Sequence, residues 1–101
     1  MQFERLHKRF FNIAFLVFSI SACSISAPVQ EMSNARQSIR AAKDANAENL
    51  ATNVLSEAKQ RLHSAMRELD AGEYEKARIL ALEAKHLALK AKQLATTKKT
   101  N

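Results

Sequence analysis

Apolar residues recur every three or four positions from residue 29 to residue 95, which is the pattern of helices that each bury one face. The chain of 101 residues contains a single glycine, Gly72, and a single proline, Pro28, so little interrupts this periodicity. We therefore expect an all-α fold, in which a short helix is followed by a long antiparallel hairpin of two helices.

The ends of the three helices are predicted from the residues that favour helix termini. The first helix should begin at Pro28, whose fixed φ suits the first helical position, and end near residues 44–46, which prefer caps and turns. The second should run continuously over residues 47–71 and stop at Gly72. The third should span residues 73–95.

The third predicted helix carries an apolar seam at heptad spacing. Small residues at alternate seam positions let two backbones approach closely, so the seam should pack against the second helix, with Gly72 and Tyr74 at the turn between them. The helical domain is thus predicted over residues 29–96, with a frayed tail at 97–101. The seam comprises Ala77, Leu80, Ala84, Leu87, Ala91 and Leu94, widened by Ala81, Ala88 and Ala95.

Three large aliphatic residues of the third helix do not fit the seam. Leu82 and Leu89 are seven residues apart on the opposite face, and Ile79 flanks them. Two interpretations are open. The first helix could pack over these residues and complete a three-helix bundle, or they could form an exposed patch for another protein or another copy of the chain.

The N-terminal segment has the features of an export signal. Arg5, Lys8 and Arg9 form a basic beginning, and residues 10–20 form an apolar run of the length a signal peptide needs. A membrane-spanning helix requires about 20 apolar residues, which this run does not reach. Cys23 follows it and, as the single cysteine, has no partner within the chain for a disulfide.

The stretch Ile20-Ser21-Ala22-Cys23 resembles a bacterial lipobox, whose pattern is an aliphatic residue, two small residues and cysteine. The resemblance implies a lipoprotein signal peptide at residues 1–22, diacylglycerol on the sulfur of Cys23, an N-acyl chain such as palmitate, and a lipidated tether at 23–28. Ser24 in place of aspartate resembles the sorting pattern of enteric lipoproteins and implies the periplasmic face of the outer membrane. An ordinary secretory signal with a chance cysteine and an uncleaved membrane anchor are the alternatives.

The composition predicts a weak core and no catalytic site. Removal of the signal leaves fewer than ~80 residues with Tyr74 as the one aromatic side chain, so the domain should be marginally stable or depend on a partner. His63 and His86 are isolated on polar helix faces, which predicts solvated side chains and not metal ligands. No paired carboxylates, glycine-rich phosphate loop or basic stripe with aromatics is present. We expect neither an enzyme nor a metal, cofactor or nucleic-acid site.

Two stretches of the chain, residues 42–50 and residues 69–78, resemble the two interhelical turns of a bacterial helical family, the domain of unknown function 4398. In that family a lipobox precedes three helices whose alanines recur every three or four residues. The Gly72-Glu73-Tyr74 turn also looks like the middle of a tetratricopeptide repeat, although the family more often has Gly-Asp-Tyr there. The family has no established activity, so the resemblance implies a fold and a location.

Three functions are compatible with these features. The first is a periplasm-facing outer-membrane lipoprotein that acts as a structural or protein-interaction module. The second is a wall-associated spacer similar to the murein lipoprotein, which attaches through a C-terminal lysine; here Thr100 and Asn101 follow the lysines, and Gly72 interrupts the rod. The third is a module for an anionic ligand such as lipopolysaccharide or peptidoglycan, using Lys85, Lys92, Lys98 and Lys99.

Overall fold

The computed structural model describes residues 27–100, which contain α-helices and turns and no strand. The predicted signal peptide, Cys23 and Ser24 lie outside the described residues. The described helices are α2 (Val29–Asp44), α3 (Ala47–Leu50), α4 (Thr52–Asp70) and α5 (Tyr74–Thr100). The expectation of an all-helical domain is thus met over this range.

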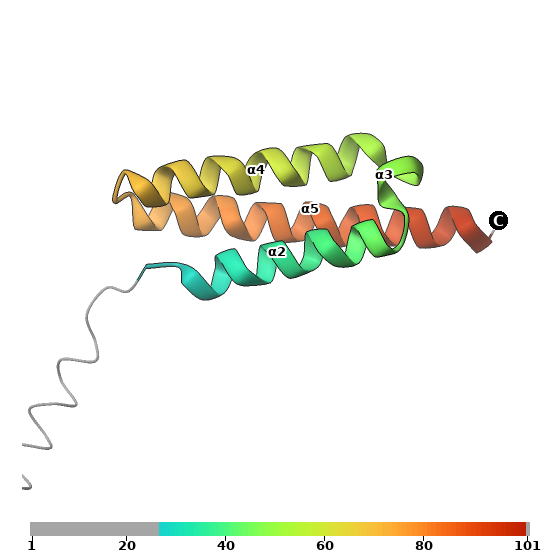
Figure 1. Cartoon of the computed structure of the whole chain (residues 1–101), viewed down its shortest axis with the longest axis horizontal. Helices are drawn as coiled ribbons and strands as arrows, with labels where there is room; N and C mark the ends of the chain where they lie inside the picture. The colour runs from blue at the N-terminus through green and yellow to red at the C-terminus, as the bar shows by residue number, and fades with distance from the viewer. Residues whose placement is uncertain (1–26, 101) are drawn as a thin grey trace, which may run out of the picture.

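α5 is the central helix of the domain. It has 27 residues, and α4 lies along one side of it while α2 lies along the other (Figure 1). α4 and α5 run in opposite directions and are joined by a short turn, whereas α2 and α4 contact each other much less than either contacts α5. The fold therefore depends mainly on how α5 packs against its two neighbours.

The buried face of α5 consists entirely of alanines. Each of them is 0% exposed, whereas Leu80 and Leu87 are half-buried and Leu94 is 38% exposed. The predicted seam of alternating alanine and leucine is therefore displaced, because the strip of α5 that faces both neighbours must be narrow. Small side chains there let both helices come close, and the leucines fall to its side. The buried residues are Ala77, Ala81, Ala84, Ala88, Ala91 and Ala95.

Two larger side chains fill the space between the helices. Met32 of α2 is 1% exposed and packs in a cluster with Ala65 of α4 and Ala81 of α5. Leu55 of α4 is also 1% exposed and belongs to the larger core cluster, which includes Ala88 of α5. No polar or charged side chain within residues 27–100 is buried, so packing of apolar groups alone forms this core.

The predicted continuous second helix is interrupted at Ala51. Ala51 has φ −144° and ψ 48°, which are not helical angles, so α3 ends before this residue and α4 begins after it. The hydroxyl of Thr52 donates a 2.7 Å hydrogen bond to the carbonyl of Glu48 across the break. Because Ala51 itself is buried, the apolar periodicity continues through the interruption and gives no sign of it.

Two residues in the left-handed conformation form the remaining turns. Asn46 has φ 66° between α2 and α3, and Gly72 has φ 78° after α4. The amide of Gly72 donates to the carbonyl of Leu69 at 3.0 Å, and that of Glu73 donates to Glu68 at 2.9 Å. This pair of bonds is the Schellman closure, which needs a left-handed residue where Gly72 stands.

The C-terminal segment differs from the expected frayed tail. α5 continues through Thr100, and the ammonium of Lys98 donates a 2.6 Å hydrogen bond to the carbonyl of Leu50. The hydroxyls of Thr96 and Thr97 donate to carbonyls one turn earlier in α5. The helix therefore continues past residue 95, where the sequence predicted its end. Within residues 27–100 no helix is long and apolar enough to cross a membrane.

Candidate functional site

A group of exposed aliphatic side chains lies on the face of α5 opposite its buried alanines. Ile79, Leu82 and Leu89, here called the α5 patch, are 50%, 40% and 43% exposed. α2 does pack against α5, but beside the patch and not over it. The interpretation in which the first helix covers these residues is therefore wrong, and the α5 patch is open to solvent in the isolated chain.

The α5 patch is bordered by ion pairs on both sides. On the α2 side, Arg78 Nε lies 3.3 Å from Glu31 Oε1, and Arg78 Nη1 lies 2.6 Å from Glu75 Oε2. On the α4 side, Arg61 Nε lies 3.5 Å from Glu83 Oε2. An apolar centre with a charged rim is the usual composition of a protein–protein contact surface.

A shallow hollow continues the α5 patch toward the C-terminus. Leu89 and Gln93 line it together with Thr96, Thr97 and their neighbours on α5. The hydroxyls of both threonines already donate to carbonyls of their own helix. Because α5 alone forms the hollow, this surface suits an extended or helical segment lying across it better than it suits an enclosed small molecule.

The four lysines considered for an anionic ligand do not gather at one place. Lys85, Lys92 and Lys99 are seven residues apart and follow one side of α5. Lys98 lies on another side and donates to the carbonyl of Leu50. The structure therefore separates Lys98 from the other three.

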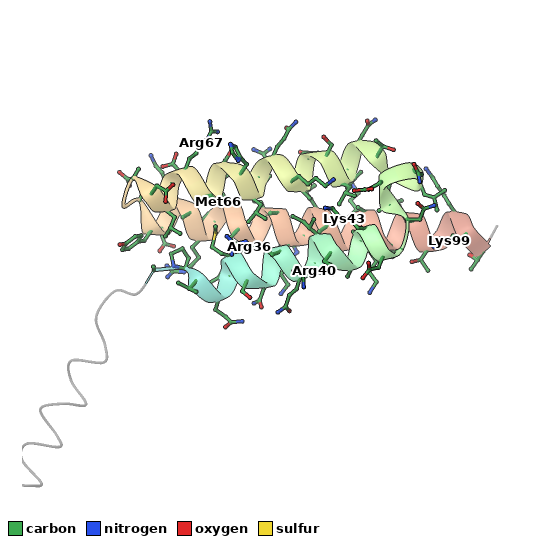
Figure 2. The ribbon with its side chains drawn as sticks, in the orientation of Figure 1. Arg36, Arg40, Lys43, Met66, Arg67 and Lys99 are labelled. Carbon is green, nitrogen blue, oxygen red and sulfur yellow. The ribbon has the colours of Figure 1, made fainter. Side chains whose placement is uncertain are left out.

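A second charged feature lies on α2. Arg36, Arg40 and Lys43, here called the basic row, are exposed and follow one another along the helix (Figure 2). Residues at these spacings of four and three share one side of a helix. None of the three forms an ion pair with any described residue. The basic row was not predicted from the sequence, although its cations stand at the i, i+4, i+7 spacing that would indicate it.

The remaining predicted site residues are at the surface or outside the described range. Tyr74 begins α5 directly after the Gly72 turn and is 37% exposed. His63 and His86 are exposed on α4 and α5. Among residues 27–100 no three His, Cys, Asp or Glu side chains are placed to hold a metal ion. Cys23 and Ser24 are not among the described residues.

Comparisons with known proteins give one match. Residues 30–101 match the model of a family described as a domain of unknown function, DUF4398. The match begins in the first turn of α2 and takes in α3, α4 and α5. No curated protein and no solved structure matches the chain.

Proposed function

The chain belongs to the DUF4398 family, and from that premise we propose that it is an outer-membrane lipoprotein on the periplasmic face, whose helical domain is a non-catalytic docking module for another protein. The proposal has two parts, a lipid anchor at Cys23 and a protein contact at the α5 patch. The basic beginning, the apolar run and the lipobox-like stretch before Cys23 support the anchor. Diacylglycerol and an N-acyl chain would provide the two apolar anchors that stable attachment requires.

The observation that carries the docking part is the exposure of the α5 patch. Large aliphatic residues usually lie inside a domain. α5 instead buries a face of alanines and leaves Ile79, Leu82 and Leu89 40–50% exposed. Removing such side chains from water on binding contributes about 25 cal/mol per Å² of apolar surface. The ion pairs at the rim, Arg78–Glu31 and Arg61–Glu83, would keep the contact specific at its edges.

The shape of the surface supports a protein partner. The patch lies along a single convex helix, where an amphipathic helix of a partner can align its own apolar side chains at similar spacing. We also propose that α4, the Gly72 turn and α5 form a tetratricopeptide-like hairpin, a fold whose surfaces commonly bind protein segments.

The anchor is tested by intact mass and membrane fractionation of the full chain beside Cys23→Ala and Ser24→Asp. The expected wild-type protein has lost residues 1–22, carries added acyl mass and fractionates with the outer membrane. Cys23→Ala should lack the acyl mass, and Ser24→Asp should remain acylated but move to the inner membrane. An unacylated wild-type protein would exclude the anchor.

The docking part is tested by photo-crosslinking in cells from residue 82 or residue 89. Gln60, which is exposed on α4, is the matched control position. We expect one adduct of the same mass from both patch positions, absent at position 60 and weakened at least tenfold when Ile79→Ser is added. The adduct mass distinguishes a second copy of the chain from a different protein. Equal crosslinking at all three positions would exclude the α5 patch as the docking surface.

A further inference from the structure

The side of α2 that carries the basic row combines one exposed aliphatic residue with three cations. Val29 is 66% exposed, and it precedes Arg36 by seven residues, which places both on the same side of the helix. Arg40 and Lys43 continue that side toward the end of α2. Thus an exposed aliphatic residue is followed by three cations along a stretch of helix whose charged part, from Arg36 to Lys43, extends over about 10 Å.

The acidic residues of α2 do not neutralise this side. Glu31 is held against α5 by Arg78, at 3.3 Å. Asp44, the last residue of α2, follows Arg40 by four positions, but no ion pair joins it to the basic row in the described structure. The cations of the row therefore remain available for an external anionic surface. The same helix has its other side fixed to α5, so its orientation is set by the fold.

The position of α2 in the chain indicates which anionic surface it would meet. Val29 is six residues after Cys23, a distance of at most about 20 Å even in a fully extended chain. If Cys23 carries the lipid anchor, as proposed above, α2 is the helix held nearest to the bilayer, at a high effective concentration of headgroups. A basic stretch next to a lipid anchor adds electrostatic attraction to anionic headgroups.

We propose that the basic row of α2, with Val29 beside it, docks the helical domain on an anionic phospholipid surface next to the anchor. The guanidinium and ammonium groups contact phosphates while Val29 reaches the apolar boundary of the headgroup layer. This contact uses a different helix from the α5 patch, so the domain would lie against the membrane while α5 remains free for a protein. The proposal rests on the anchor but not on the protein partner.

The experiment uses a residue of the row as its own reporter. The full-length protein is reconstituted in vesicles of phosphatidylcholine alone or with about a third phosphatidylglycerol. Acetylation of Lys43 by a water-soluble reagent is followed by mass spectrometry, with exposed Lys90 of α5 as the internal reference. We expect anionic vesicles to slow acetylation of Lys43 at least threefold relative to Lys90. The protection should disappear at about 0.5 M salt, where charges are screened within a few ångströms.

A charge-removing variant and a matched control complete the test. Arg36→Gln with Arg40→Gln keeps Lys43 as reporter and should abolish its protection, whereas Lys92→Gln with Lys99→Gln removes the same charge from α5 and should leave protection unchanged. Equal rates for Lys43 in both vesicle types, or protection of Lys90 in its place, would overturn the proposal. Intact mass of the same sample reports acylation of Cys23 separately, so failure of the anchor and failure of the docking surface are distinguished.

Discussion

The ammonium of Lys98, near the end of α5, donates a 2.6 Å hydrogen bond to the carbonyl of Leu50, the last residue of α3. The two residues are 48 positions apart in the chain. The last carbonyls of a helix lack partners within it and attract cations, so this bond both completes the end of α3 and holds the final turn of α5. It joins α5 to α3 at one end of the domain. At the other end, the Arg78–Glu31 ion pair joins α5 to the first turn of α2.

Substitution of Lys98 should loosen the end of α5. We expect Lys98→Met to raise the amide exchange rates of residues 96–100 severalfold, because one hydrogen bond of this kind contributes about 0.5–1.5 kcal/mol. Hydrogen–deuterium exchange measured by mass spectrometry would detect the change. Lys99→Met is the control, since the side chain of Lys99 is exposed and forms no ion pair or hydrogen bond with a described residue. Identical exchange in the two variants would show that the Lys98 bond does not hold the helix end.

A larger side chain on the alanine face of α5 should destabilise the fold. Ala88 is 0% exposed and lies in the core with Leu55, so Ala88→Leu would push the neighbouring helices apart. Overpacking of this kind typically costs about 1–3 kcal/mol. Urea unfolding should show this loss, while Gln93→Leu at an exposed position of the same helix should change stability by less than about 0.5 kcal/mol. Similar midpoints for both variants would contradict the packing described for α5.

Removal of the Leu55 side chain should have the largest effect of any leucine substitution in α4. Leu55 is 1% exposed in a core otherwise rich in alanine, which offers few atoms to fill the space left by Leu55→Ala. We expect a loss of about 2–5 kcal/mol, measured by thermal unfolding. The comparison is Leu82→Ala in the α5 patch, where a 40% exposed side chain contributes little to the isolated chain. An equal loss at Leu82 would mean that the patch is covered.

The turn after α4 should tolerate asparagine better than alanine. Gly72 has φ 78°, and nothing lies within 4 Å of the position that a Cβ would occupy, so a substitution meets backbone strain and no steric clash. Gly72→Ala should destabilise by about 1–2 kcal/mol, the usual cost of the left-handed conformation for a residue with a Cβ. Gly72→Asn should lose less, because asparagine adopts this conformation more readily. Chemical denaturation of both variants orders them, and a more stable alanine variant would contradict this explanation.

Much of the helix arrangement follows from local patterns in the sequence. The first helix ends at Asp44 and the second ends just before Gly72, close to the predicted boundaries, because capping and left-handed preferences belong to the residues themselves. The interruption at Ala51 could not be predicted in this way. Alanine favours helix, and this alanine also keeps the apolar periodicity, so no local preference predicts the φ of −144° that separates α3 from α4.

The candidate surfaces, too, were predicted only in part from local sequence patterns. The spacing of Leu82 and Leu89 placed them off the seam. Whether α2 covers them depends on how α2 packs against α5, which the sequence does not give. In the structure both leucines are exposed. The basic row was present in the sequence as two arginines and a lysine at helical spacing, Arg36, Arg40 and Lys43. Only the tertiary structure shows that Glu31, on the same helix, pairs with Arg78 of α5 and not with the cations of the row.

The sequence by itself determined an all-helical domain, a turn near residues 44–46, a turn at Gly72, and an N-terminal pattern typical of an exported, lipid-anchored chain. These features depend on residue preferences and spacings over a few positions. Only the tertiary structure decided that alanines, and not leucines, form the buried face of α5, and that Lys98 reaches Leu50. The alanines and the leucines of α5 both recur at spacings of three and four, so spacing alone does not decide which of them is buried. The physical reason for the outcome is that α5 packs between two helices at once, and the positions of α2 and α4 set which strip of α5 faces both.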